Sequence, residues 1–433
     1  METTKNLKLP QYTGEDIFDL QDINKAYDSI DKAYGDLDDA RKEVVNIKNE
    51  IPKTNATAEV ISARGGKETL GKRLDEFGSQ LDTKTSKEET KNIQVKLTDD
   101  IKTINSQLDT IDSKMAELKI EDLIKINNKI KSASIYMPVN SVSTEENFTT
   151  IIEKCKDSNC NTITICPIFW LESKTSNVFT GYKTGLSKEK ILSYCTIVKN
   201  NGLKVAIKPH VGGEGISSHG DIQPTNLTTW ITNYSTLYKE LLTLCKDYVD
   251  IVCIANELNG QTNSNLSQWK QLISEVRGIK NSFLIGTACH FGELSTNVFL
   301  SELDFLGCNM YVPIEGDMST NIEKQRKSLF TLTNSINTLL KKGDELNKPI
   351  IITEVGILPF EMSLSNPEKW GFTEEPPIVE DVQVRYYNLA LKEYLYGNNI
   401  IGTFIWNACD GFTFIDRKAQ QTVKELYGGG KNV

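Results

Sequence analysis

The feature that most constrains the fold of this chain is a regular alternation of strand-like and helix-like segments after residue 130. Long amphipathic stretches such as 228–248 and 321–346 have the length and the period of crossover helices. Between such stretches lie eight short apolar runs that read as buried strands: 133–139, 162–169, 203–209, 250–256, 282–288, 303–311, 349–355 and 400–406. Eight β–α units predict an α/β fold of the (β/α)8 or TIM-barrel type, with its active site at the carboxyl ends of the strands.

A doubly wound open sheet is the rival architecture for the same alternation. Sheets of that kind bind nucleotides through a glycine-rich loop. The glycine cluster after the third strand, Gly212, Gly213 and Gly215, lacks the GxGxxG spacing of such a loop. The sequence therefore favours the barrel, and it predicts no cofactor.

Two carboxylates occupy equivalent places in this pattern. Glu257 directly follows the fourth strand, and Glu354 lies at the end of the seventh. A glutamate after a strand is often only a residue at a helix N-terminus, where the helix dipole favours it. Two carboxylates from different strands at the catalytic mouth are, however, what glycoside hydrolysis requires, one as acid and one as nucleophile. Glu257 and Glu354 are therefore the candidate catalytic residues.

Other side chains at the ends of predicted strands are candidates for substrate binding. They are Asn256, Asn309, Tyr311, Trp170, Trp406, Lys208 and His210. Asn256 is placed to hydrogen-bond a sugar hydroxyl, Tyr311 to hold the nucleophile, and the two tryptophans to stack on pyranose rings, although tryptophan is commonly a core residue. Lys208 and His210 add polar groups to the rim of the barrel. No metal is expected, because His210 and His219 have no third ligand at suitable spacing.

A direct attack by Glu354 makes geometric and electrostatic demands. No water fits between the nucleophile and the sugar, so the two carboxyl groups should lie about 5 Å apart. Apolar walls and the charge of Glu354 should raise the pKa of Glu257, while donors such as Tyr311 keep Glu354 ionised.

Composition restricts the partners and the compartment. The net charge of −9 and the lack of a basic stripe argue against a nucleic-acid partner. The nine cysteines include no CxxC pair, and Cys166, Cys253 and Cys308 lie in apolar runs, so buried free thiols are expected. No apolar segment at the start of the sequence has the pattern of a signal peptide, and none elsewhere has the length of a membrane span. We expect synthesis in the bacterial cytoplasm and no membrane insertion.

The first 130 residues have a different character. Apolar residues recur at three- and four-residue steps in two heptad registers, one at Ile23, Tyr27, Ile30, Tyr34, Leu37 and Val44, and one at Leu97, Ile101, Ile104, Leu108, Ile111, Met115 and Leu118. In the second register Ile104 and Ile111 fall at d positions, which disfavours a parallel dimer and favours a trimer. A single helix packed along the next domain is the alternative.

The predicted organisation has four parts. They are residues 1–52 with the first coiled coil, a strand-turn-helix module at 53–85, the trimerising coiled coil at 86–130, and the barrel at 131–433. The stretches LKLPQYTGEDIFDLQDINKAYDSIDKAY and AEVISARGGKETLGKRLDEF resemble the N-terminal part of tail fibres and receptor-binding proteins of bacteriophages and phage-tail-like bacteriocins. This resemblance implies attachment to tail or baseplate proteins and a place in the virion tail.

The barrel resembles the clan A retaining glycosidases, most closely the β-mannanase-like family 113, from about residue 133 to 427. The resemblance is carried by PIFWLESKTSNV, GLKVAIKPHV, IANELNGQTNSNLSQWKQLISEVR, TEVG, NPEKW and GTFIWNACDGF. It implies that Asn256 and Glu257 are the Asn–Glu pair of strand four, with Glu257 the acid/base, and that Glu354 is the nucleophile. The segment 357–382 departs from the family pattern and borders the cleft, so it bears on substrate specificity.

The sequence thus predicts a tail fibre whose barrel binds and hydrolyses a bacterial surface polysaccharide or wall glycopolymer. A lectin-like adhesin that keeps the barrel without turnover is the alternative reading. A free polysaccharide-degrading enzyme is disfavoured, because it would leave the heptads without a use. The sequence does not specify the sugar, the linkage or the host.

Overall fold

The computed structural model describes residues 128–429 apart from 138–139, 294–299, 373, 375 and 398, together with residues 2–3, 10–11 and 102. The described residues from 128 to 429 belong to one compact unit, Leu123–Lys431. Near the start of the chain, β1 (Glu2–Thr3) pairs antiparallel with β2 (Pro10–Gln11). The two heptad registers, apart from the single residue Lys102, and the 53–85 module lie outside the described residues.

Eight parallel strands close into a barrel. They are β3 (Ile130–Met137), β4 (Thr162–Leu171), β6 (Lys204–Ile207), β8 (Ile251–Asn256), β9 (Leu284–His290), β10 (Leu306–Asn309), β11 (Ile350–Val355) and β12 (Ile400–Ile405). Each strand pairs with its neighbours in the barrel, and β3 closes the ring because it pairs with both β12 and β4. Closure excludes the open doubly wound sheet and confirms the predicted barrel. All eight predicted strands are present, although the first begins at Ile130, before the predicted run.

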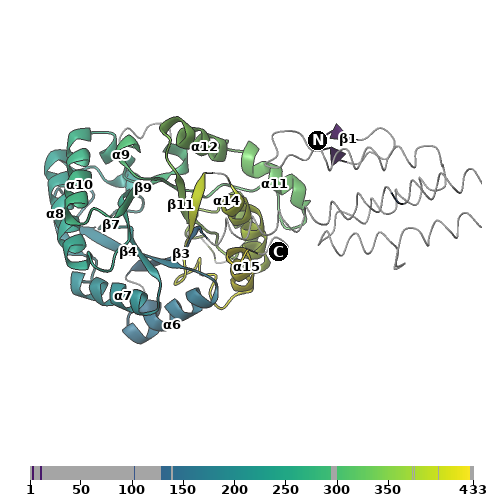
Figure 1. Cartoon of the computed structure of the whole chain (residues 1–433), viewed down its shortest axis with the longest axis horizontal. Coiled ribbons are helices and arrows are strands. Elements are labelled where there is room, and N and C mark those ends of the chain that lie inside the picture. Colours follow the sequence, from purple (N-terminus) through teal and green to yellow (C-terminus); the bar gives the residue numbers. More distant parts are fainter. Residues whose placement is uncertain are drawn as a thin grey trace, which may run out of the picture. The chain divides into compact units, whose positions relative to one another are not determined.

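Helices form the outer layer around the strands (Figure 1). They are α6 (Glu145–Asp157), α7 (Lys188–Asn200), α8 (Leu227–Cys245), α9 (Asn259–Thr262), α10 (Leu266–Ile279), α11 (Ile322–Thr331), α12 (Ser335–Leu346), α13 (Asp381–Tyr386), α14 (Lys392–Tyr396) and α15 (Lys418–Tyr427). Thr144 and Ser187 cap α6 and α7 by accepting hydrogen bonds from backbone amides of the first turn. The predicted stretch 321–346 is two helices, because Asn334 takes the left-handed conformation with φ 53° between them.

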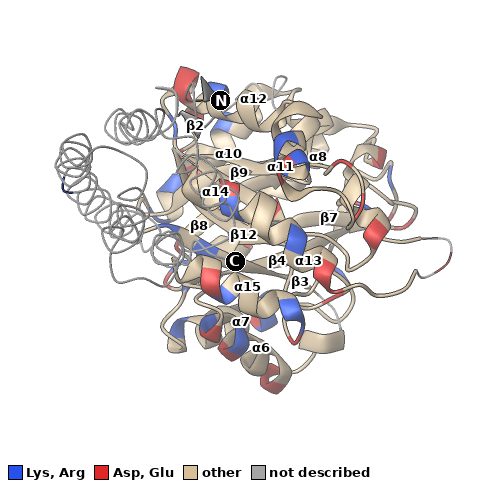
Figure 2. Cartoon of the chain, turned by 90° about the vertical axis from the view of Figure 1, so that its right-hand side faces the viewer, with Lys and Arg blue, Asp and Glu red and all other residues tan. Residues whose placement is uncertain are grey.

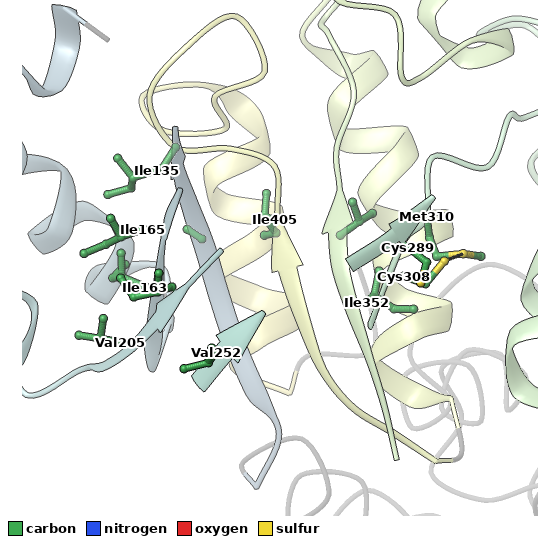
Figure 3. Packing of buried hydrophobic residues seen from close by; sticks show 14 of the residues in the cluster. Ile135, Ile163, Ile165, Val205, Val252, Cys289, Cys308, Met310, Ile352 and Ile405 are labelled. Carbon is green, nitrogen blue, oxygen red and sulfur yellow. Dashed lines mark hydrogen bonds between the residues drawn. The ribbon is translucent and has the colours of Figure 1, made fainter. Parts of the chain in front are cut away.

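Side chains alternate between two hydrophobic cores. Ile251, Cys253, Ile351 and Phe404 belong to a small cluster with Ala206 and Phe305 that fills the barrel interior. Strand residues of the other parity, including Val205, Val252, Ile352 and Ile405, point outward and pack beneath the helices in the large cluster shown in Figure 3. Parallel strands buried on both faces explain why the sequence reads as continuous apolar runs.

Two short strands extend one wall beyond the barrel. At the carboxyl end of β4, β5 (Phe179–Tyr182) pairs antiparallel and β7 (His210–Gly213) pairs parallel. In the chain β5 lies between β4 and α7, and β7 lies between β6 and α8, so the extension carries His210 just beyond the end of β6.

The expectation of buried free thiols is confirmed, because all nine cysteines are free and buried.

In the described part of the chain, no helix is long and apolar enough to cross a membrane. Figure 2 shows Lys and Arg interspersed with Asp and Glu on the face that it presents, without a patch of one sign.

Candidate active site

A change of side-chain parity in β11 turns Glu354 into the barrel. Ile351 belongs to the interior core, whereas Ile352 and Val355 both belong to the outer core. Strict alternation would place Val355 on the interior side, so the parity shifts within Thr353–Glu354. The register between β11 and β12 is irregular between Ile352 and Val355, as expected for a β-bulge. The bulge directs a charged side chain inward where alternation alone would have sent it under the helices.

Strand β8 changes parity in the same way before Glu257. Ile254 and Ala255 are consecutive yet both belong to the outer core, and the register with β9 shifts between Cys253 and Asn256. Asn256 is thereby turned inward. Glu257 follows with φ 52°, a left-handed conformation that is costly for a residue with a side chain, and its amide donates to Ala288 O at 2.8 Å. Glu257 precedes Leu258, the N-cap of α9, and so lies just before that four-residue helix.

Glu354 is held by one cation and one hydroxyl. The Lys208 ammonium, fully buried, forms an ion pair with Glu354 Oε1, and it also donates to Thr353 O at 3.2 Å. Tyr311 donates its hydroxyl to Glu354 Oε2 at 2.5 Å. His210 Nε2 lies 3.8 Å from Oε1. Tyr311 therefore lies where the sequence predicts, against the proposed nucleophile.

Glu257 is held by an amide and a histidine. Asn309 Nδ2 donates to Glu257 Oε1 at 2.8 Å, and His219 Nδ1 lies 3.3 Å from Oε2. Asn309 Nδ2 also donates to Asn256 Oδ1 at 3.2 Å, and Asn256 Nδ2 lies 3.3 Å from His210 Nδ1. Asn256 thus uses both ends of its amide within the protein.

Hydrogen bonds connect Glu257 to the residue that precedes Glu354. Thr353 donates its hydroxyl to Asn309 Oδ1 at 2.8 Å, and Asn309 in turn donates to Glu257. Because the Asn309 amide oxygen accepts one hydrogen bond and its nitrogen donates another, the orientation of the amide is fixed. These bonds fix Glu257 relative to β11, the strand that carries Glu354.

The electrostatics of the two carboxylates differ from the sequence prediction. Burial raises the pKa of Glu257, but the hydrogen bond and charge of His219, with the Asn309 amide, outweigh it and lower the pKa to about 2. Burial and the charge of Glu257 raise the pKa of Glu354, against the opposing effects of Lys208 and Tyr311. The predicted raised pKa of Glu257 is therefore wrong for this state, because His219 was not expected beside it.

Trp406 lies beside Glu354 but has no open face. Its ring stacks on His210 at 5.2 Å and meets Tyr136 at 5.3 Å and Trp370 at 5.8 Å. Lys208 Nζ lies 4.8 Å from its centroid. Only 1% of Trp406 is exposed, so the predicted stacking on a sugar does not agree with this arrangement of the rings.

Two further predictions concerned Lys208 with His210 and the position of Trp170. Lys208 and His210 are buried beneath the mouth, 0% and 6% exposed, and do not form its rim. Trp170 lies on the extension formed by β4, β5 and β7, where Lys183 Nζ lies 5.8 Å from its ring. The side chains that contact Glu257 and Glu354 are other residues.

Sequence reasoning missed several residues of the site, above all His219, Thr353, Tyr136 and Trp370. The sequence offered one signal for His219, namely that histidine is rare in this chain, with three residues in all. In the structure each of the three lies near a glutamate at the carboxyl ends of the strands. Among the described residues, no group of three or more His, Cys, Asp or Glu side chains is arranged to hold a metal ion.

Comparison with known proteins identifies the family. The sequence profile of Glycoside Hydrolase Family 113 matches residues 134–428, which is more than half of the chain. The chain belongs to Glycoside Hydrolase Family 113. No curated protein sequence matches it. The barrel is, by its family, a glycoside hydrolase domain of the mannanase-like type.

Solved structures support the fold of the family 113 barrel. A complex of a family 113 β-1,4-mannanase aligns with a TM-score of 0.58 at 16% identity, covering 69% of this chain and 98% of its own. The family 113 β-mannanase AaManA from Alicyclobacillus acidocaldarius, in complex with ManMIm, aligns with a TM-score of 0.58 at 17% identity, covering 69% of this chain and 96% of its own. Another family 113 β-1,4-mannanase aligns with a TM-score of 0.58 at 18% identity, covering 69% of this chain and 99% of its own. At these identities the likeness concerns the fold.

Proposed function

We propose that the barrel hydrolyses a bacterial surface glycan with retention of anomeric configuration, with Glu257 as acid/base and Glu354 as nucleophile. One observation carries this proposal. The two carboxylates follow or end different strands that carry bulges, lie at the same end of the barrel, and Asn309 links Glu257 to Thr353, the residue before Glu354. A pair of carboxylates flanking one position is the arrangement that glycosidic bond cleavage uses.

The reaction would proceed in two steps. First, the Glu354 carboxylate attacks the anomeric carbon while Glu257 gives its proton to the departing glycosidic oxygen, forming a glycosyl ester. Then Glu257, now a carboxylate, takes a proton from a water that attacks the same carbon and releases Glu354. Lys208 and Tyr311 stabilise the charge of Glu354 before attack and after release.

The first step requires a proton on Glu257. The hydrogen bond and charge of His219 are the largest influences that lower the pKa of Glu257, to about 2. His219 lies on the short helical turn His219–Asp221 of a loop and reaches Glu257 at 3.3 Å, a contact that an incoming sugar can replace. Replacing it would remove the main influence that lowers the pKa of Glu257 and leave burial, which raises it. Substrate binding would therefore supply the protonated acid.

The substrate class is inferred from the family. Three similar structures are described as β-1,4-mannanase or β-mannanase. We propose a mannose-containing β-linked glycan as the first candidate, and a wall glycopolymer of the host as the natural source.

The N-terminal 130 residues motivate the proposed setting. The resemblance of residues 7–34 and 58–77 to phage tail fibres, together with two heptad registers, supports a trimeric tail fibre or receptor-binding protein. Such a protein would bind tail or baseplate proteins at its N-terminus, reside in the virion tail, and present three barrels to the cell surface. Purified phage or phage-tail-like particles probed with an antibody against the barrel would carry the protein at their tails, and particles without it would contradict this setting.

The test of catalysis replaces each carboxylate by its amide. Glu257→Gln and Glu354→Gln keep the size of the side chain but remove the acid or the nucleophile, so release of reducing sugar should fall by a factor of about 10³ or more. Glu345→Gln, on the exposed surface of α12, is the matched control and should keep full activity. Full activity in either of the first two variants would contradict the assigned roles.

One observation favours a glycan-binding adhesin as the second candidate. The hydrogen bond and charge of His219 lower the pKa of Glu257 to about 2, which opposes the protonated form that an acid catalyst needs, and Glu354 is 5% exposed and paired with Lys208. Product analysis separates the two functions. A glycan that binds the parent protein tightly and is never cleaved, under conditions where the barrel is folded, would favour the adhesin.

A further inference from the structure

An exposed tryptophan borders the candidate active site. Of the large hydrophobic side chains that are exposed in the described part of the chain, Met362, Trp370 and Ile378 belong to the segment that joins β11 to α13. Trp370 is the largest of them and is 53% exposed. Trp370 ends the NPEKW stretch, within the 357–382 segment that borders the cleft.

Trp370 packs against a group of aromatic residues near the candidate active site. Its ring centroid lies 5.8 Å from that of Trp406, 5.9 Å from Tyr136 and 5.0 Å from Phe412. Trp406 is 1% exposed and Phe412 is 0% exposed, so the Trp370 ring is supported by buried rings and still keeps half of its surface open. A supported ring with an open face is the form that carbohydrate-binding aromatic residues take.

The segment around Trp370 is held in place on both sides. Glu368 Oε2 lies 2.9 Å from His290 Nε2 at the end of β9, which ties the segment to a strand two positions away from β11 in the barrel. Phe372 packs edge-on against Phe360 at 5.5 Å, and Lys369 Nζ lies 4.5 Å from the Phe372 ring. The position of Trp370 is therefore defined before any ligand arrives.

The rings that pack near Trp370 are covered by protein. His210 Nε2 and Trp406 Nε1 are buried and make no hydrogen bond, and His210 Nε2 lies 3.8 Å from Glu354 Oε1. Burial together with the charge of Lys208 keeps the pKa of His210 well below its usual value. Among Trp370, Trp406 and Phe412, Trp370 is therefore the ring whose surface a ligand can reach.

We propose that Trp370 is an outer sugar-binding platform on which the pyranose unit next to the one at the carboxylates stacks its apolar face. A pyranose combines an apolar C–H face with a polar rim, which suits an exposed indole ring near the polar side chains of the candidate active site. This inference rests on the proposed function, because it takes the ligand to be a saccharide, and it assigns a specificity role to the 357–382 segment.

The test measures binding without turnover. In the Glu257→Gln background of the full chain, isothermal titration calorimetry would give Kd for a panel of β-linked hexasaccharides of mannose, glucose and N-acetylglucosamine. For the hexasaccharide bound best, Trp370→Ala should weaken Kd about tenfold, and Trp370→Phe should restore most of the loss because it keeps an aromatic face. Met362→Ala is the matched control, since Met362 is 52% exposed on the same segment, and it should leave Kd unchanged. Thermal melting checks that each variant is folded.

Each outcome bears on the proposal. If the background protein binds a hexasaccharide and Trp370→Ala binds it equally well, the platform is refuted while the proposed function stands. If Trp370→Ala binds more tightly, Trp370 covers the site instead of serving it, which also refutes the platform. If no hexasaccharide of the panel binds the folded background protein, the saccharide ligand and the platform fail together. If Trp370→Phe weakens binding as much as Trp370→Ala does, stacking on an aromatic face is refuted.

Discussion

Removal of His219 should raise the pKa of Glu257 strongly. The pKa of this carboxyl lies near 2 against an ordinary value of 4.5, and the hydrogen bond and charge of His219 are the largest of the causes that lower it. With His219→Ala, burial becomes the dominant influence, so the pKa should rise above 4.5. A rise of more than two pKa units corresponds to about 3 kcal/mol, at 1.36 kcal/mol for each unit.

The loop that carries His219 should survive this substitution. Asp221 Oδ2 accepts hydrogen bonds from the backbone amides of Ser217 and Ser218 at 2.9 Å each, and Gln261 donates to Ile222 O at 2.7 Å. These contacts do not involve the imidazole. The change in the pKa of Glu257 would therefore report the loss of the His219 side chain and not a displaced loop.

The assay is a ¹³C NMR titration of the glutamate carboxyls, with the Glu257 signal identified by its loss in Glu257→Gln. His290→Gln is the matched control, because the charge of His290 is the smallest of the contributions that lower the pKa of Glu257. The stability of the parent follows the same linkage: a depressed folded-state pKa stabilises the fold above the unfolded pKa of about 4.5, and this contribution is lost as pH falls toward 2. An unchanged pKa in His219→Ala, or an equal rise in His290→Gln, would refute the reasoning.

Further predictions concern stability and assembly. Lys208→Met leaves the Glu354 carboxylate buried without its cation and should cost about 3–5 kcal/mol of unfolding free energy in urea, a loss that the added change Glu354→Gln should reduce; no coupling between the two would contradict the ion pair. Gly356→Ala would place a Cβ 1.8 Å from Trp406 O, so the midpoint of thermal unfolding should fall, and a wild-type midpoint would contradict the close approach of β11 and β12. The intact chain should be a trimer and residues 123–431 a folded monomer by light scattering, whereas a monomeric intact chain would refute the predicted coiled coils.

The barrel was predictable because its strands carry a strong local signal. Strands covered on both faces are apolar at every position, and IVCIA and PIIIT stand out between amphipathic stretches without any knowledge of their neighbours. The candidate carboxylates were predictable for a related reason. Glu257 and Glu354 interrupt or follow these apolar runs at the end where a TIM barrel has its active site.

The surroundings of the carboxylates were not predictable from local sequence. His219 reaches Glu257 from a loop whose path depends on the contacts of Asp221 and Gln261, so the low pKa of Glu257 depends on tertiary structure. Trp406 was expected to be open, but Tyr136 and Trp370 pack against it from other segments. Bulges in β8 and β11 change the parity of side chains without a glycine or proline to mark them.

The anomeric configuration of the first product tests the central claim most directly. Proton NMR of sugar released from a β-linked manno-oligosaccharide, recorded before mutarotation, should show the β-anomer first, because attack by Glu354 followed by attack of water inverts the carbon twice. A first product with the α-anomeric signal would contradict the assignment of Glu354 as nucleophile, since single inversion requires a water between the carboxylates and a separation wider than the predicted distance of about 5 Å.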